Sequence, residues 1–182
     1  MTISVSLYRF EKRKARFMDS LGARILHTNN LVESEGRGEV IFSSCKKDEN
    51  GENGAIRRRR TVMICDDERD LLLMFAIELE TKYNILTAES GEECIQKYIS
   101  ERHNGRKIDL ILLDYRLGDI MGDSVARRIK ELNDVKIILI SAYDLDQQMI
   151  RDLKENDYVV DILQKPVTLE SLVGTVVQEI GM

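Results

Sequence analysis

The chain lacks tryptophan, carries few aromatic residues and contains no long apolar run. Aromatic residues make up 5% of its 182 residues, while hydrophobic residues reach 43%, which is enough for a real core. A membrane span needs about 20 consecutive apolar residues, and no stretch approaches that length. Charged residues interrupt the first dozen positions too early for a signal peptide. We therefore expect a cytoplasmic protein with one ordinary domain and an appendage.

The cysteines and histidines form no recognisable framework. Cys45, Cys65 and Cys94 are scattered, odd in number and without a Cys-x-x-Cys pair. This usage argues against disulfide bonds and is typical of reduced thiols, with Cys65 a plain strand residue. His27 and His103 have no partners at metal-ligand spacing.

The net charge of −5 conceals two segments of opposite sign. Residues 1–60 carry 13 Lys/Arg against 8 Asp/Glu, a net +5, whereas residues 61–182 carry 14 against 24, a net −10. The contrast predicts two physical units, divided after the four arginines at 57–60. That arginine run could bind nucleic acid or an anionic surface, although a solvated basic linker beside an acidic domain is the favoured interpretation.

The basic segment at 1–60 is predicted to be an N-terminal extension, partly helical or disordered. Apolar residues keep a helical spacing over about 7–26, and 39–45 is a short strand-like stretch. Residues 46–54 are polar and contain glycine, which is typical of a linker or disordered loop. Composition leaves open that translation begins at a later start codon.

From residue 61 onward, apolar β-branched runs alternate with helical patterns. The final helix is the clearest, because Leu169, Leu172, Val173 and Val176 follow the i, i+3, i+4 rule behind Thr168 as a candidate N-cap. Such alternation predicts an α/β, doubly wound five-stranded parallel sheet of order 2-1-3-4-5 with five helices. The predicted strands are 61–65, 84–88, 110–114, 135–141 and 158–163, and the predicted helices about 69–82, 91–102, 122–133, 145–156 and 168–180.

Acidic residues follow two of the predicted strands at the point where each strand ends. Asp66 and Asp67 follow the first strand, and Asp114 ends the third. In this strand order the two strands are neighbours at the switch point, where ligands bind. Clustered carboxylates raise one another's pKa unless a cation lies among them, and hard oxygen ligands suit Mg²⁺. Taken singly, each aspartate is better explained as a turn or cap residue; taken together they favour a metal site.

Two further polar residues lie at the ends of the fourth and fifth predicted strands. Ser141 ends the fourth strand and is followed by the small Ala142, so its hydroxyl can donate to an anion at that edge. Lys165-Pro166 follows the fifth strand and brings a cation to balance carboxylates or a phosphoryl group. A lone serine would be read as a helix cap and a lone lysine as a solvated charge, but the ordered set is more specific.

Residues 61–182 resemble the receiver domain of two-component response regulators. The matching segments are 63–68, 109–114 with Gly122 eight residues further on, 140–142 and 163–166. The resemblance implies that Asp114 is the phosphoacceptor for a phosphoryl group from the phosphohistidine of a sensor histidine kinase. It also implies that Ser141 is the switch hydroxyl and that Lys165 contacts first the acceptor carboxylate and then the phosphoryl oxygens.

The same resemblance implies a Mg²⁺ cofactor and a signalling role. Asp67, Asp114 and the backbone carbonyl of Arg116 would hold the ion, with Asp66 acting through water. The protein would then be a single-domain response regulator that catalyses only its own phosphorylation and dephosphorylation. Its signal would pass to an unknown downstream protein through the face formed by the fourth helix, fifth strand and fifth helix.

Two positions depart from the family pattern, and two other functions compete with it. Leu117-Gly118 stands where a proline is usual, and Ile162 occupies the position of the usual aromatic switch.

One alternative is a Mg²⁺-dependent phosphohydrolase with an aspartyl-phosphate intermediate. The haloacid dehalogenase type, however, places its nucleophile after the first strand as Asp-x-Asp, unlike Asp66-Asp67-Glu68. The other alternative is a nucleic-acid binder that works through residues 1–60.

Overall fold

The computed structural model describes residues 58–182. The chain divides into two units, Met1–Arg58 and Arg59–Met182, and the predictions for 7–26, 39–45 and 46–54 lie outside the described residues. The strands are β1 Thr61–Cys65, β2 Asn84–Ala88, β3 Leu110–Asp114, β4 Lys136–Ser141 and β5 Asp161–Gln164. The helices are α2 Arg69–Leu79, α3 Gly91–His103, α4 Gly122–Leu132, α5 Gln147–Glu155 and α6 Leu169–Ile180.

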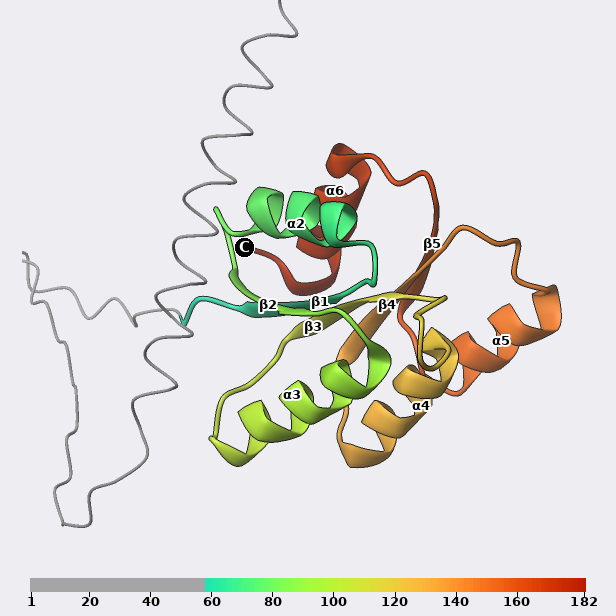
Figure 1. The fold of residues 1–182 in the computed structure, drawn as a ribbon, viewed down its shortest axis with the longest axis horizontal. Helices are drawn as coiled ribbons and strands as arrows, with labels where there is room; N and C mark the ends of the chain where they lie inside the picture. Colours follow the sequence, from blue (N-terminus) through green and yellow to red (C-terminus); the bar gives the residue numbers. More distant parts are fainter. Residues whose placement is uncertain (1–57) are drawn as a thin grey trace, which may run out of the picture. The chain divides into compact units, whose positions relative to one another are not determined.

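The five strands form one parallel sheet in the order β2-β1-β3-β4-β5, which confirms the predicted topology. Helices α2 and α6 cover one face of the sheet, and α3, α4 and α5 lie on the other (Figure 1). All five residues of β3 are buried. A strand covered on both faces has to be apolar throughout, which explains the continuous Leu-Ile-Leu-Leu run before Asp114.

The predicted start of the fifth strand is wrong by three residues. Residues 158–160 were expected in the strand, but the N–H groups of Tyr158 and Val159 both donate to the carbonyl of Leu153 and finish α5. Asp157 makes the reversal with a φ of 55°, a left-handed conformation that Asp adopts more readily than most residues. Helix α5 also begins later than predicted, because the Asp146 side chain caps it by accepting from the N–H of Met149.

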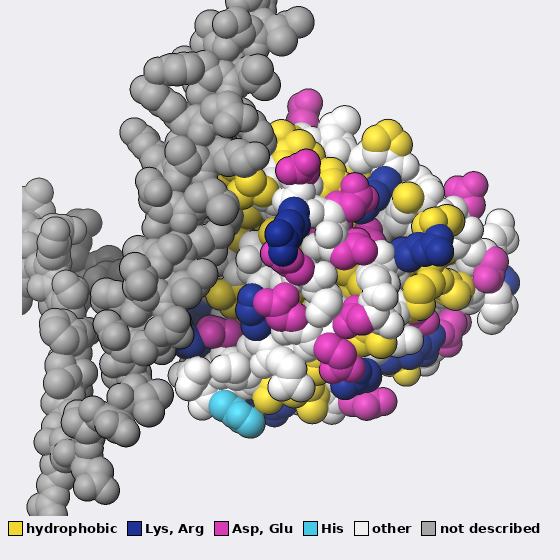
Figure 2. Space-filling view, in the orientation of Figure 1, with side chains coloured by type: hydrophobic (Ala, Val, Ile, Leu, Met, Phe, Trp, Pro, Cys, Tyr) yellow, Lys and Arg dark blue, Asp and Glu magenta, His cyan; other side chains and the backbone are white. Residues whose placement is uncertain are grey.

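Charges on the outside of the described unit are mixed in sign. In Figure 2, Lys and Arg side chains are interspersed with Asp and Glu over the face shown, without a continuous basic stripe. Within residues 58–182, no helix is long and apolar enough to cross a bilayer.

Candidate functional site

One lysine and two carboxylates converge at the carboxyl edge of the sheet. Asp114 is the last residue of β3, Asp66 directly follows β1, and Lys165 directly follows β5. The Nζ of Lys165 lies 2.7 Å from Asp114 Oδ1 and 3.1 Å from Asp66 Oδ2. Asp66 is 2% exposed and Asp114 6% exposed. The parallel sheet therefore gathers side chains from three strands around a single ammonium group.

Backbone amides hold the other oxygen of each carboxylate. Asp114 Oδ2 accepts from the N–H of Arg116 at 2.8 Å, and Asp66 Oδ1 accepts from the N–H of Glu68 at 2.9 Å. In both cases an aspartate bonds to the amide two residues further on, the local turn that this side chain favours. Each strand thus ends in a turn that orients its own carboxylate.

The site contains more negative than positive charge. Burial raises the pKa of Asp66 above its usual value, even though the Glu68 amide and Lys165 oppose the shift. Burial would lower the pKa of Lys165, but the hydrogen bond that its ammonium donates to Asp114 and the charge of Asp66 outweigh burial and raise that pKa. Lys165 also lies 3.7 Å from Glu68 Oε1. One cation therefore faces several carboxylates, an arrangement that favours a further cation.

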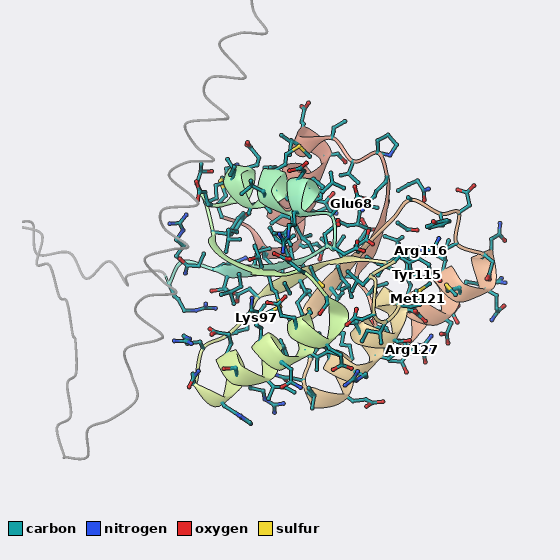
Figure 3. All side chains as sticks on the ribbon, in the orientation of Figure 1. Glu68, Lys97, Tyr115, Arg116, Met121 and Arg127 are labelled. Atoms are coloured by element: carbon teal, nitrogen blue, oxygen red, sulfur yellow. The ribbon has the colours of Figure 1, made fainter. Side chains whose placement is uncertain are left out.

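Asp67 and Arg116 border the same edge but are exposed. A Cβ added to Gly118 would lie 3.6 Å from Asp67 Oδ2, which places that carboxylate beside the loop after β3. The Arg116 side chain turns to Tyr143, where its guanidinium lies 5.1 Å from the ring centroid and bonds the phenol oxygen. Figure 3 shows Glu68, Tyr115 and Arg116 at this edge.

The donor set fits Mg²⁺ better than a transition metal. Among residues 58–182, no three His, Cys, Asp or Glu side chains form a ready metal cage. A cation here would depend on a few carboxylates, a backbone carbonyl and water. Those are the hard oxygen ligands of Mg²⁺, which keeps several of its waters.

Ser141 is at the expected strand end, but its hydroxyl is engaged elsewhere. The residue is 1% exposed. Its Oγ donates to the carbonyl of Tyr143 and accepts from the N–H of Tyr143, both at 2.9 Å. A hydrogen bond from Ser141 to an anion at Asp114 would require the hydroxyl to leave these two partners.

The loop after β3 and the start of α4 make two contacts that the sequence did not predict. Asp119 accepts from the N–H groups of Gly91 and Glu92, both at 2.9 Å, and so holds the first turn of α3. Burial alone would raise the pKa of Asp119, but these backbone N–H groups outweigh it and lower that pKa. A Cβ on Gly122 would lie 2.3 Å from the carbonyl oxygen of Asp114, so only glycine fits there. The N-cap at Ser90 was the available signal for an anion near α3, because a helix N-terminus attracts negative charge.

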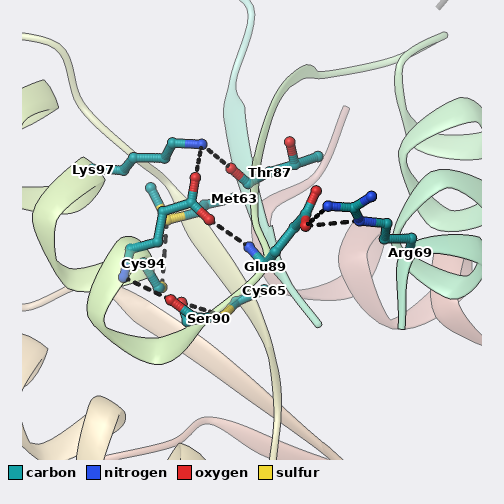
Figure 4. A network of polar contacts seen from close by, with 9 residues as sticks. Met63, Cys65, Arg69, Thr87, Glu89, Ser90, Cys94 and Lys97 are labelled. Atoms are coloured by element: carbon teal, nitrogen blue, oxygen red, sulfur yellow. Dashed lines mark hydrogen bonds and ion pairs between the residues drawn. The ribbon is translucent and has the colours of Figure 1, made fainter. Parts of the chain in front are cut away.

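The two described thiols beside the site are buried and free of disulfide bonds. Cys65 Sγ donates to the carbonyl of Ser90 at 3.4 Å, and Cys94 Sγ lies 3.5 Å from Met63 Sδ (Figure 4). The hydrogen bond of the Cys65 thiol to Cys94 and burial raise the pKa of that thiol far above its usual value. Cys65 is therefore an unreactive strand residue, as predicted; Cys45 lies outside the described residues.

Comparison with known proteins gives a family match over most of the described residues. Residues 62–177 match the model of the response regulator receiver domain. The response regulator ArlR of Staphylococcus aureus is 30% identical over 118 residues, which are 63% of this chain and 50% of that protein. The chain thus spans about half the length of the curated relatives it matches.

Solved structures share the fold. A two-component response regulator from Clostridium difficile is 29% identical with a TM-score of 0.58, over 66% of this chain and 94% of that one. The CheX-CheY-BeF3-Mg complex from Borrelia burgdorferi has a TM-score of 0.59 at 24% identity, over 65% of this chain and 87% of that one. The second likeness shows the fold alone.

Proposed function

The chain belongs to the response regulator receiver domain family, and on that premise we propose that Asp114 accepts a phosphoryl group from the phosphohistidine of a sensor histidine kinase. The observation that supports this most strongly is the position of Lys165 Nζ, 2.7 Å from Asp114 Oδ1 and 3.1 Å from Asp66 Oδ2. A buried carboxylate in contact with an ammonium group is prepared for an incoming anion, because the cation can follow the charge onto the phosphoryl oxygens.

In the proposed reaction, an oxygen of Asp114 attacks the phosphorus while the phosphorus–nitrogen bond of the phosphohistidine breaks. The nitrogen keeps the electron pair of that bond. If the other ring nitrogen carries a proton, the imidazole leaves in its neutral form, and otherwise the departing nitrogen takes up a proton from water. The product is an acyl phosphate on Asp114. Such transfers depend mainly on positioning and charge neutralisation, and the Arg116 amide and Lys165 supply both at this carboxylate.

Mg²⁺ is the proposed cofactor. Asp67, Asp114 and the backbone carbonyl of Arg116 would hold it, and Asp66 would act through water. When bound, the ion would offset the repulsion between the acceptor carboxylate and the incoming phosphoryl group. The excess of carboxylates at this edge supports the assignment.

The proposed output is a change in protein–protein contacts. An acyl phosphate adds roughly −1.5 to −2 charges at one point, and Lys165 and the Ser141 hydroxyl are the groups placed to respond. The α5–β5–α6 face would then bind an unidentified downstream protein. In this layout residues 1–60 form an extension and 61–182 the receiver domain, and the protein would act in the cytoplasm.

Labelling with a small-molecule phosphodonor tests the proposal. Incubation of the full chain with acetyl phosphate and Mg²⁺ should yield about one acid-stable, base-labile phosphoryl group per chain, and a chelator should prevent it. Asp114→Asn should remain unlabelled. Equal labelling of Asp114→Asn would overturn the assignment, and sustained hydrolysis of phosphate esters by the wild type would favour a phosphohydrolase instead.

A further inference from the structure

Tyr115 connects the proposed phosphoacceptor directly to α5. It follows Asp114 in the chain, and its backbone is fixed on both sides. Its N–H donates to the carbonyl of Ile140, and its carbonyl accepts from the N–H of Gly122, both at 2.7 Å. Its half-buried side chain reaches α5, where the phenol oxygen lies 3.6 Å from Met149 Sδ. Because the backbone is held, only the ring of Tyr115 can move freely.

The ring has room to move. A cavity of about 360 Å³ lies between the loop after β3 and the loop after β4. Its lining includes Tyr115, Met121, Tyr143, Leu145 and Met149. A side chain that borders an open cavity can take another rotamer without the overpacking that a filled core imposes.

Helix α5 is lightly attached to the described unit. Leu153 is its one buried residue. Near the C-terminal end of the helix, Asp152 pairs with Arg127, whose guanidinium lies 4.5 Å from the ring centroid of Tyr158. The Tyr115–Met149 contact joins α5 to the strand that carries Asp114. An element with few buried contacts responds to the change of one contact.

Ser141 holds the backbone of Tyr143, which lines one side of the cavity. Its hydroxyl bonds both the N–H and the carbonyl of Tyr143. If the hydroxyl turned to a phosphoryl group on Asp114, the backbone of Tyr143 would lose both bonds. Tyr143 could then move relative to the cavity that it lines. The ring of Tyr115, which lines the same cavity, would then change its packing against Met149.

Strand β5 offers no aromatic ring for this task. Its residues are Asp-Ile-Leu-Gln, and Ile162 is a half-buried aliphatic residue paired with Leu139. We propose that Tyr115 is the positioning residue that transmits phosphorylation of Asp114 to α5, through its contact with Met149. This inference rests on the proposed function of Asp114.

Hydrogen exchange of the α5 amides tests the relay separately from phosphoryl uptake. The full chain is compared with and without acetyl phosphate and Mg²⁺, and phosphoryl uptake is measured in the same samples. In the wild type, phosphorylation should change α5 exchange by roughly fivefold. In Tyr115→Leu the phosphoryl group should still be taken up, while the change in α5 exchange is lost.

Two further variants make the result decisive. Tyr158→Leu is the matched control, because it makes the same substitution at a half-buried tyrosine that follows the C-terminal end of α5 and does not line the cavity, and it should keep the response. Met149→Ala removes the same contact from the helix and decides the matter if Tyr115→Leu does not fold. A wild-type response in Tyr115→Leu or Met149→Ala, or no response in phosphorylated wild type, would overturn the relay alone. Absence of phosphoryl uptake by the wild type would instead refute the proposed function, and the relay with it.

Discussion

Lys165 and Asp114 form an ion pair across the carboxyl edge of the sheet, with Nζ and Oδ1 2.7 Å apart. Only 14% of the lysine side chain and 7% of the aspartate side chain are exposed. The same ammonium group contacts Asp66, whose side chain is 2% exposed. Buried charges of this kind depend on their partners, since loss of one leaves the others without compensation. Lys165 thus stabilises the same edge of the sheet at which it is proposed to contact the phosphoryl group.

Lys165→Met should destabilise the chain. Two low-exposure carboxylates would lose their cation, so we expect the free energy of unfolding at neutral pH to fall by about 1–3 kcal/mol or more. Urea denaturation in the presence of a chelator measures this. Lys136→Met is the control, because Lys136 pairs with Glu179 while 47% exposed, and a surface pair contributes about 0–1 kcal/mol. Equal losses in the two variants would contradict the account.

Gly122→Ala should disturb the site through the backbone. The added Cβ would lie 2.3 Å from the carbonyl oxygen of Asp114 and 2.9 Å from Tyr115 Cα, so the strand end or α4 must shift, at a cost of about 1–3 kcal/mol. Phosphoryl uptake should fall as well. Gly174→Ala, in α6 with no atom within 4 Å of the new Cβ, should instead raise stability by roughly 0.5–1 kcal/mol. Thermal unfolding and labelling of both variants check the pair.

Asp119→Ala should weaken the start of α3 in a pH-dependent way. Loss of two bonds to the helix N-terminus should lower the free energy of unfolding by about 1 kcal/mol at neutral pH. The pKa of Asp119 is lowered in the fold from 3.8, so its ionised form stabilises the fold above that value. The contribution is lost as the pH falls through the folded-state pKa. A deficit in Asp119→Ala that stayed constant into the acid range would contradict this role.

The fold was predictable because its signals are local. Buried parallel strands have to be apolar throughout, and each aspartate at a strand end forms its own turn. The convergence of Asp66, Asp114 and Lys165 follows from strand order alone. The start of β5 was not predictable, because the amides of Tyr158 and Val159 finish α5 instead.

Side-chain directions were harder to predict than positions. Ser141 was placed at the correct strand end, but its hydroxyl bonds Tyr143, a choice set by the local loop. The contact from Tyr115 to Met149 joins residues 34 positions apart, and the cap by Asp119 joins residues 28 and 27 positions apart. Such contacts depend on how helices pack over the sheet, which apolar periodicity does not encode.

The most direct test of the central claim is to locate the phosphoryl group chemically. An aspartyl phosphate is reduced by borohydride to homoserine, whereas a free carboxylate is not, so mass spectrometry of the digested chain identifies the residue. After treatment with acetyl phosphate and Mg²⁺, we predict homoserine at position 114 and at no other aspartate. Reduction at Asp66 or Asp67, or no reduction at position 114 in a chain that has taken up phosphoryl, would contradict the account.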